Sequence, residues 1–472
     1  MENASKFKSF IKSLEFRWSD LLFIIGFIPF AVFLIFGQLF MQYPDPNMVA
    51  LKPWAIILCF ITILLSWSGY IFLEWKRGVR VNKYLTIAFA FIALIGIISV
   101  LIQPANHSIN MIDADGNRQL ISLTISSTHY MFFIFDVFSI ILLIYIGLFI
   151  LPYRFKSITF IKYLGYAVIG FAFVVLLYSY ITESKQYYPF FIYLFEGNVT
   201  GINYNAMVSF LIHRNACGMM LMLAILFCFI NHSIEKKWWY FPIAIYFYLN
   251  MILTFCKTSL IISLILFLVY GVFVLIRTFN QYKKRNLIIL IAIGAVVFVG
   301  VILAGISIIS KGKYIGFIYT ILHGDETSGD ISHTLDSRSL IWNNTYQLIN
   351  QKPGLYFFFG RGFGLMNEML LPMNVANGDT PLTFPTHNSY LNLFAEGGIL
   401  YLLAYLALLG YVVYIAIQYF KKEPDKGLAL SLGMIAFTFY SLIETIHYLV
   451  YPFMFVILVA YHSSKSQEIE NN

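Results

Sequence analysis

Charged residues are scarce in this sequence. They make up 11% of its 472 residues, while hydrophobic residues make up 60%. A typical soluble domain has roughly 25% charged and about 45–50% apolar residues. So much apolar surface does not fit inside one globule, because a folded domain keeps a large part of its surface in solvent. The composition therefore excludes an ordinary soluble enzyme and makes lipid the expected solvent for much of the surface.

Common metal-binding and catalytic patterns are also missing. The sequence contains four cysteines, Cys59, Cys217, Cys228 and Cys256. None shows C-x-x-C spacing, so neither a zinc site nor a disulfide framework is indicated. There is no P-loop, no G-x-S-x-G and no internal repeat. Asp113 and Asp115 lie in a segment with turn-forming glycine and asparagine, and we expect neither a metal ion nor another cofactor.

Long apolar runs are abundant. A spanning helix needs about 20 largely apolar residues. Such runs lie near 21–41, 54–73, 84–102, 129–151, 158–182, 206–231, 239–255, 258–276, 287–309, 390–420, 427–443 and 446–462. They predict an all-α, polytopic membrane protein with about twelve transmembrane helices. The first run is too long for the core of a cleavable signal peptide, so we expect it to be the first spanning helix.

The basic residues predict how the chain crosses the membrane. With the N-terminus in the cytoplasm, roughly two thirds of the 31 Lys and Arg residues fall in cytoplasmic segments, as the positive-inside rule requires. The net charge of +8 is explained in this way rather than by nucleic acid. Both termini are then cytoplasmic. The scheme gives nine spanning helices in 1–309, a helical extracytoplasmic loop subdomain in 310–386, and three spanning helices with a cytoplasmic tail in 387–472.

Charged residues near the predicted external helix ends are the main functional candidates, because a charge inside a membrane is costly. They are Arg214, Lys257, Arg338, Arg361, His387, Glu396, Glu444, His447, His129 and Asp136. Taken singly, each is better explained as an interfacial anchor that reaches toward water. Taken together, the three arginines and His387 lie on one predicted side of the membrane. This favours a single cavity that faces a polyanion.

Two short motifs add detail to this interpretation. In Gly360-Arg361-Gly362-Phe363-Gly364, glycines allow close backbone approach to a ligand, and the arginine fork suits phosphate oxygens. No βαβ unit precedes it, so it is not a dinucleotide fingerprint, and a plain turn is an equal alternative. Further on, Thr386 is a candidate N-cap for a helix that begins near His387, whose neutral imidazole can accept or relay a proton. Glu396-Gly397-Gly398 adds a carboxylate and flexible backbone on the same helix.

The order of these motifs resembles a known family. His387-Asn388 is followed by nine residues, Gly398, two residues and Tyr401; Ser337-Arg338 precedes the glycine-rich stretch, and Arg214-Asn215 lies in a mid-chain helix. In these respects residues 206–462 resemble the O-antigen polymerase and O-antigen ligase superfamily (Wzy-like and WaaL-like proteins), membrane glycosyltransferases of the bacterial envelope. Lys257 stands where such proteins often have arginine, which keeps a point charge for phosphate but loses bidentate geometry.

The resemblance implies a GT-C-like fold in the bacterial cytoplasmic membrane, with the active site facing outside. It implies an inverting, metal-independent transfer of an O-antigen, capsule or exopolysaccharide repeat unit from undecaprenyl diphosphate to an acceptor sugar hydroxyl. Arg214, Arg338 and Arg361 would stabilise the leaving diphosphate. His387 would orient or deprotonate the acceptor, with Glu396 in support. The residues expected to bind substrate are Lys257, Gly360, Gly362, Gly364, Asn388 and Asn215.

Other functions stay open at this point. A ligase would use the same chemistry to move the glycan onto an acceptor lipid or wall polymer. A transporter or flippase of lipid-linked sugars would show repeat symmetry and broken helices at the bilayer midplane, and no repeat is evident. A structural envelope protein would leave the external arginines without a role. The expected partners are the lipid-linked oligosaccharide, the bilayer, and chain-length regulator and flippase proteins, with no nucleic acid.

Overall fold

The structure is a computed structural model in which two compact units are described. The described residues are 17–42, 53–79, 83–103, 106–112, 118–124, 134, 138–155, 157–182, 207, 209–211, 214–254, 256–279, 335–362, 386–445 and 450–471. Unit 1 is assigned Met1–Thr159, Leu335–Tyr419 and Phe437–Asn472, and unit 2 is assigned Phe160–Thr334 and Phe420–Ala436. Each unit is described below by itself, over these residues.

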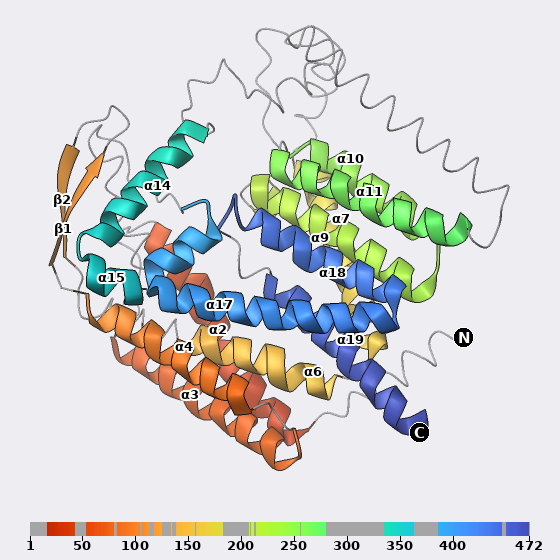
Figure 1. Cartoon of the computed structure of the whole chain (residues 1–472), viewed down its shortest axis with the longest axis horizontal. Helices are drawn as coiled ribbons and strands as arrows, with labels where there is room; N and C mark the ends of the chain where they lie inside the picture. The colour runs from red at the N-terminus through yellow and green to blue at the C-terminus, as the bar shows by residue number, and fades with distance from the viewer. Residues whose placement is uncertain are drawn as a thin grey trace, which may run out of the picture. The chain divides into compact units, whose positions relative to one another are not determined.

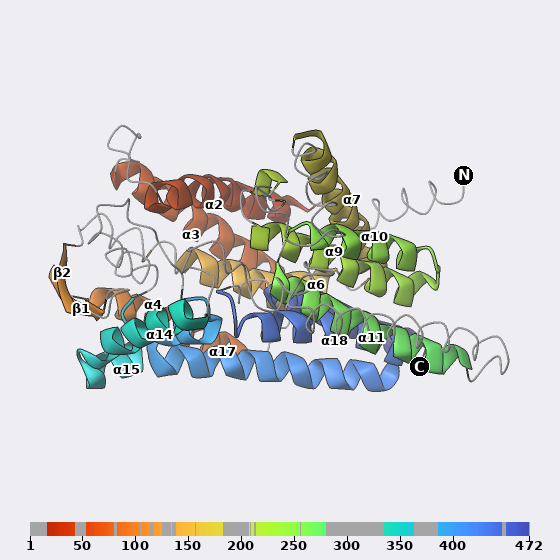
Figure 2. The same ribbon diagram turned by 90° about the horizontal axis from the view of Figure 1, so that it is seen from above.

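Unit 1 contains helices and one hairpin (Figure 1). Its elements are α2 (Trp18–Gln42), α3 (Pro53–Lys76), α4 (Lys83–Leu101), β1 (Asn106–Ile112), β2 (Arg118–Thr124), the π-helical turn η1 (Ile146–Ile150), α6 (Leu151–Arg154), α14 (Leu335–Asn350), α15 (Pro353–Phe359), most of α17 (Ser389–Lys422), the end of α18 (Pro424–Tyr440) and α19 (Val450–Asn471). Helices α2 and α3 pack against each other, and α14 lies against α15 and β1 (Figure 2).

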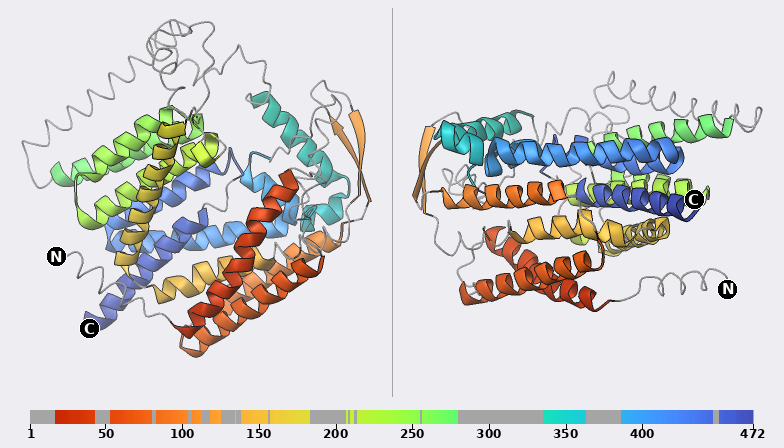
Figure 3. Two further views of the ribbon diagram at one scale, coloured as in Figure 1. Left: turned by 180° about the vertical axis from the view of Figure 1, so that it is seen from behind. Right: turned by 60° about the horizontal axis from the view of Figure 1, so that its bottom comes forward.

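Unit 2 is organised around one buried helix. Its elements are α7 (Ile158–Thr182), the 3₁₀ turn η2 (Ser209–Leu211), α9 (Arg214–Glu235), α10 (Tyr240–Ile252), α11 (Lys257–Phe279) and the first part of α18. Helix α9 is buried along most of its length and packs against α10 and α11 (Figure 3). Gly218 permits the close approach of α11, because a Cβ there would lie 2.6 Å from the Cβ of Cys256.

Five helices within the described residues are long and apolar enough to cross a membrane. They are Ile57–Lys76, Ile158–Thr182, Arg214–Glu235, Thr258–Arg277 and Ser389–Lys422. Shorter apolar helices lie at Trp18–Phe30, Phe89–Leu101, Phe138–Arg154 and Tyr240–Ile252. Large apolar side chains such as Leu65 and Ile181 are exposed on these helices, which suits a surface that contacts lipid. The predicted span 287–309 lies outside the described residues, and the total of twelve spans and the GT-C-like arrangement stay predictions.

Among the described elements, one β-hairpin departs from the predicted all-α fold. Strands β1 and β2 pair antiparallel, from Asn106 opposite Thr124 to Ile112 opposite Arg118. Several apolar residues alternate with polar ones here, as in half-buried strands. The segment is too short and too polar to span a membrane, so a search for apolar runs does not detect it. The other described elements are helical, as predicted.

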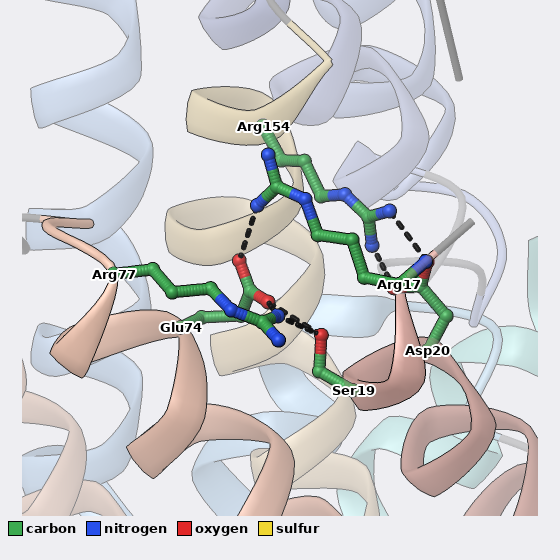
Figure 4. A network of polar contacts seen from close by, with 6 residues as sticks. All are labelled: Arg17, Ser19, Asp20, Glu74, Arg77 and Arg154. Carbon is green, nitrogen blue, oxygen red and sulfur yellow. Dashed lines mark hydrogen bonds and ion pairs between the residues drawn. The ribbon is translucent and has the colours of Figure 1, made fainter. Parts of the chain in front are cut away.

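An ion-pair network joins the ends of α2, α3 and α6 in unit 1 (Figure 4). Its members are Arg17, Ser19, Asp20, Glu74, Arg77 and Arg154. The Glu74 side chain is fully buried, and its two oxygens accept hydrogen bonds from Ser19 Oγ (2.7 Å), Arg77 (2.8 Å) and Arg17 (3.3 Å). Arg154 pairs with Asp20. Three of the basic residues predicted to be cytoplasmic are therefore neutralised, at least in part, by carboxylates that connect helices.

Replacing Glu74 tests whether this network stabilises the fold. We expect Glu74→Ala to destabilise the protein by about 1–3 kcal/mol, because it strips a buried acceptor from Arg17 and Arg77, which are partly exposed. The measurement is the midpoint of thermal unfolding in detergent. Glu423→Gln is the control, since Glu423 forms an exposed pair with Lys426 and should shift the midpoint little. Equal midpoints for the two variants would contradict the role of the network.

Candidate active site

The candidate site begins with a break in α17. The helix is interrupted at Gly398, whose φ of 71° and ψ of −177° are not helical. A residue in this conformation interrupts the hydrogen bonds that would satisfy the preceding carbonyls. Two of those carbonyls find other donors: Ala395 accepts from the backbone N–H of Arg361 (2.7 Å), and Glu396 accepts from that of Gly362 (2.8 Å). The break therefore holds the end of α15 and the turn that follows it.

Glycine is required on both sides of this contact. Gly360 has a φ of 74°, and a Cβ there would overlap the backbone carbonyl of Glu396. A Cβ on Gly398 would likewise overlap the carbonyl of Phe358. L-residues with side chains seldom adopt these conformations. The glycines do permit close backbone approach, as the sequence indicates, but the partner that the structure places there is α17 itself.

Arg361 is buried next to this break. Its side chain is 2% exposed. The guanidinium donates a hydrogen bond to Gln351 Oε1 (2.6 Å) and lies over the ring of Tyr356, with Cζ 4.2 Å from the ring centroid. Among the described residues, Nε has no hydrogen-bond partner and no carboxylate forms an ion pair with Arg361. Burial lowers the pKa of Arg361, but a guanidinium stays protonated at neutral pH.

A buried arginine without a carboxylate partner favours the binding of an anion. A buried charge is stable only when it is paired or well hydrogen-bonded. Arg361 has two uncharged contacts and an unused N–H donor within the described part of the chain. The turn is also fixed from α4, because Gln103 Nε2 donates to the carbonyls of Gly360 (3.2 Å) and Ser99 (2.8 Å). The site therefore presents an uncompensated positive charge on a backbone that is held in place.

His387 lies just before α17 and contacts a carboxylate from the turn that follows α18. Its Nδ1 is 2.9 Å from Oε2 of Glu444. The turn that carries Glu444 is bound to the start of α17, because Ser389 donates its N–H to Ser441 O (2.7 Å) and its hydroxyl to Glu444 O (2.8 Å). His387 has a φ of 48°, the left-handed region that few non-glycine residues occupy. This local strain is of the kind that clusters at functional sites.

The N-cap of α17 differs from the prediction. Asn388 Oδ1 accepts from the backbone N–H groups of Tyr390 and Leu391, both at 3.0 Å, so Asn388 is the N-cap and Thr386 is not. The reason is reach, since a cap oxygen bonds to the second and third helical residues. The Thr386 hydroxyl instead contacts Asn392 and Thr445. Asn388 is expected to bind substrate. In the structure its side-chain amide oxygen instead caps the helix that carries Glu396.

Helix α14 reaches the same region. Trp342 Nε1 donates to the backbone carbonyl of Thr386 (2.9 Å), the residue immediately before His387. Arg338 lies four residues before Trp342 in α14, and this spacing puts both on one face of the helix. The structure does not describe the Arg338 side chain. That Arg338 lies near His387 stays a prediction.

Unit 1 thus contains two groups of candidate residues along the first part of α17. Arg361, Gly360, Gly362 and the buried Glu396 form the group at the helix break. His387 and Glu444 form the group at the helix start. His387 and Glu396 are nine residues apart, or about 14 Å along a helix.

The remaining candidates lie in unit 2 or outside the described residues. Arg214 is the first residue of α9, followed by Asn215, and Lys257 is the first residue of α11. The two helices meet close to these ends, where Gly218 faces Cys256. Whether Arg214 and Lys257 share a cavity with Arg361 and His387 stays a prediction. Gly364, His447, His129, Asp136, Asp113 and Asp115 lie outside the described residues.

Two contacts of Arg361 were not evident from the sequence. Gln351 and Tyr356 lie ten and five residues before Arg361, in a segment that reads as ordinary helix ends. The sequence indicates that Glu444 is an external charge. It does not indicate the pairing with His387, because the two residues are 57 positions apart. A carboxylate that a tertiary turn brings to a histidine has no signal in sequence spacing. Pro353, which begins α15, marks the short link that places Gln351.

Substitution at Gly398 tests the break. We expect Gly398→Ala to destabilise the protein by more than about 1 kcal/mol, because alanine is strained where φ is positive and its Cβ would overlap Phe358. The matched control is Gly410→Ala in the same helix, where a Cβ has open space and alanine favours helix. Folded yield and thermal midpoint in detergent give the comparison. A Gly398→Ala protein as stable as Gly410→Ala would show that the break is dispensable.

Comparison with known families locates a domain that includes much of this site. The family model described as O-antigen ligase matches residues 242–406, which include Arg361, His387 and the break in α17. No curated protein matches the chain. The resemblance inferred from the motifs is confirmed: residues 242–406 of this integral membrane protein are a domain of the O-antigen ligase and polymerase superfamily.

Proposed function

We propose that the protein is a repeat-unit polymerase of a bacterial surface polysaccharide. It transfers the glycan from undecaprenyl diphosphate to an acceptor sugar hydroxyl at the outer face of the cytoplasmic membrane. The observation that carries this proposal is Arg361, a buried cation that lacks a carboxylate partner among the described residues. Such a residue suits a reaction in which a diphosphate leaves with additional negative charge.

Arg361 acts on the donor. Its N–H groups contact the diphosphate oxygens, and the attraction grows as the bond to the sugar breaks, so the transition state is stabilised more than the ground state. Arg338 approaches from α14. Arg214 and Lys257, at the starts of α9 and α11 in unit 2, stay candidates for binding an anion, because helix dipoles favour anions at these ends. The glycine contacts at Gly360 and Gly398 fix the position of Arg361 before substrate arrives.

His387 acts on the acceptor. With Nδ1–H donated to Glu444, the neutral imidazole offers Nε2 as the proton acceptor. The acceptor oxygen attacks the anomeric carbon, its proton passes to Nε2, and the bond from that carbon to the diphosphate oxygen breaks. The electron pair of that bond leaves with the diphosphate. Glu444 stabilises the imidazolium that forms, as a carboxylate does for a catalytic histidine.

A ligase is the second candidate, favoured by the description of the matching family model. It would use the same residues and differ in the acceptor, which would be a lipid or wall polymer rather than a growing glycan. The helix break at Gly398 also suits a transporter of lipid-linked sugars, since transporters use broken helices. Turnover of a lipid-linked repeat unit by purified protein separates the three: a ladder of products indicates a polymerase, single transfer to an added acceptor a ligase, and no covalent product a transporter.

Substitution of Arg361 tests the proposed role of its charge. We expect Arg361→Ala to lower turnover by roughly 10²–10³-fold, the scale seen when one preorganised donor is lost. Arg361→Lys keeps the charge but loses the planar fork, so it should recover part of that activity. Lys421→Ala is the control, because Lys421 is exposed at the other end of α17. Full turnover by folded Arg361→Ala protein would refute the proposal.

The orientation of the chain has its own test. Single cysteines are introduced as Asp330→Cys, in the predicted external segment, and Glu423→Cys, between α17 and α18, after the four native cysteines are replaced. We expect a membrane-impermeant maleimide to label position 330 in intact cells and position 423 after permeabilisation, because basic loops stay cytoplasmic. Labelling in the reverse pattern would overturn the topology and the external active site with it.

A further inference from the structure

We propose that Gln351 is a positioning residue that holds Arg361 without neutralising it, so that the full charge of the guanidinium is available to the donor diphosphate. The proposal rests on the proposed function of Arg361 and adds a residue to it. Gln351 lies in the two-residue link between α14 and α15. Neither the family match nor the sequence motifs assign it a role.

The geometry gives Arg361 a fixed direction. Gln351 Oε1 accepts from a terminal nitrogen of the guanidinium at 2.6 Å, and the Tyr356 ring lies against the guanidinium. One contact restrains the edge of the group and the other restrains its plane. Nε–H is left without a partner among the described residues. Because Gln351 is exposed while Arg361 is buried, the hydrogen bond lies at the outer edge of the cation.

The group that accepts the hydrogen bond from Arg361 decides how much of the guanidinium charge is left to attract an anion. An amide oxygen accepts a hydrogen bond but carries no net charge, and an aromatic ring attracts a cation through its quadrupole alone. A glutamate at the same place would form a charge-assisted pair of the kind that arginine prefers. That pair would stabilise the arginine and weaken its attraction for a second anion. The neutral amide therefore supports the geometry and leaves the charge uncompensated.

This reasoning predicts opposite effects on stability and on binding. Gln351→Glu should be at least as stable as Gln351→Met, because it retains an acceptor for Arg361, whereas methionine keeps the side-chain shape and removes the acceptor. Affinity for pyrophosphate, the probe that stands for the donor diphosphate, should fall in the order wild type, Gln351→Met, Gln351→Glu. We expect Gln351→Glu to lose about tenfold or more, the scale of coupling between close charges. Its turnover should fall in parallel.

The experiment uses the full chain in detergent, with pyrophosphate titrated calorimetrically and thermal midpoints measured on the same samples. Gln347→Glu, which adds the same charge one turn earlier on α14, is the control and should bind pyrophosphate nearly as wild type does. A purely structural role for Gln351 would make affinity follow stability, with Gln351→Met the weaker binder, and this would overturn the inference.

The Arg361→Ala variant separates failure of this inference from failure of the proposed function. If Arg361→Ala loses pyrophosphate binding while Gln351→Glu binds as wild type does, the role of Gln351 is wrong and that of Arg361 stands. If folded Arg361→Ala binds pyrophosphate normally, the proposed function of Arg361 fails and the inference falls with it. A loss in Gln351→Glu equal to that in Gln347→Glu would also overturn the inference, since the effect would then be general to added negative charge.

Discussion

The hydrogen bonds between the broken part of α17 and the turn after α15 are the interaction on which the candidate site depends. Gly398 frees the carbonyls of Ala395 and Glu396, and the N–H groups of Arg361 and Gly362 satisfy them. Unpaired backbone groups are costly where water is excluded, so the break and the turn stabilise each other. Arg361 is buried as a consequence, since its backbone is held directly against α17.

The arginines described in unit 1 have two kinds of partner. In the network of Figure 4, Arg17 and Arg77 pair with the buried Glu74, and Arg154 pairs with Asp20. These charges are neutralised and connect helix ends. Arg361 instead has a glutamine and a tyrosine as its described partners. The same residue type is structural where a carboxylate meets it, and it is suited to binding an anion where neutral groups hold it.

Much of the fold was predictable because membrane helices are specified locally. Each span satisfies its own backbone and needs an apolar run of sufficient length, so helices such as α3 and α7 follow directly from hydropathy. The hairpin of β1 and β2 was not anticipated, since short strands carry a weak signal. The motif that ends in Gly398 and Tyr401 was recognisable, but its spacing does not reveal that Gly398 breaks a helix.

The sequence by itself determined that the protein is built mainly of apolar membrane helices. It also identified Arg361 and His387 as candidate site residues and the family to which residues 242–406 are similar. Tertiary structure alone decided which groups surround those candidates. Asn388 rather than Thr386 caps α17, Glu444 meets His387 across 57 residues, and Gln351 meets Arg361. Caps and charge partners depend on distances of a few ångströms between segments that the chain brings together only on folding, whereas helix formation depends on neighbours in sequence.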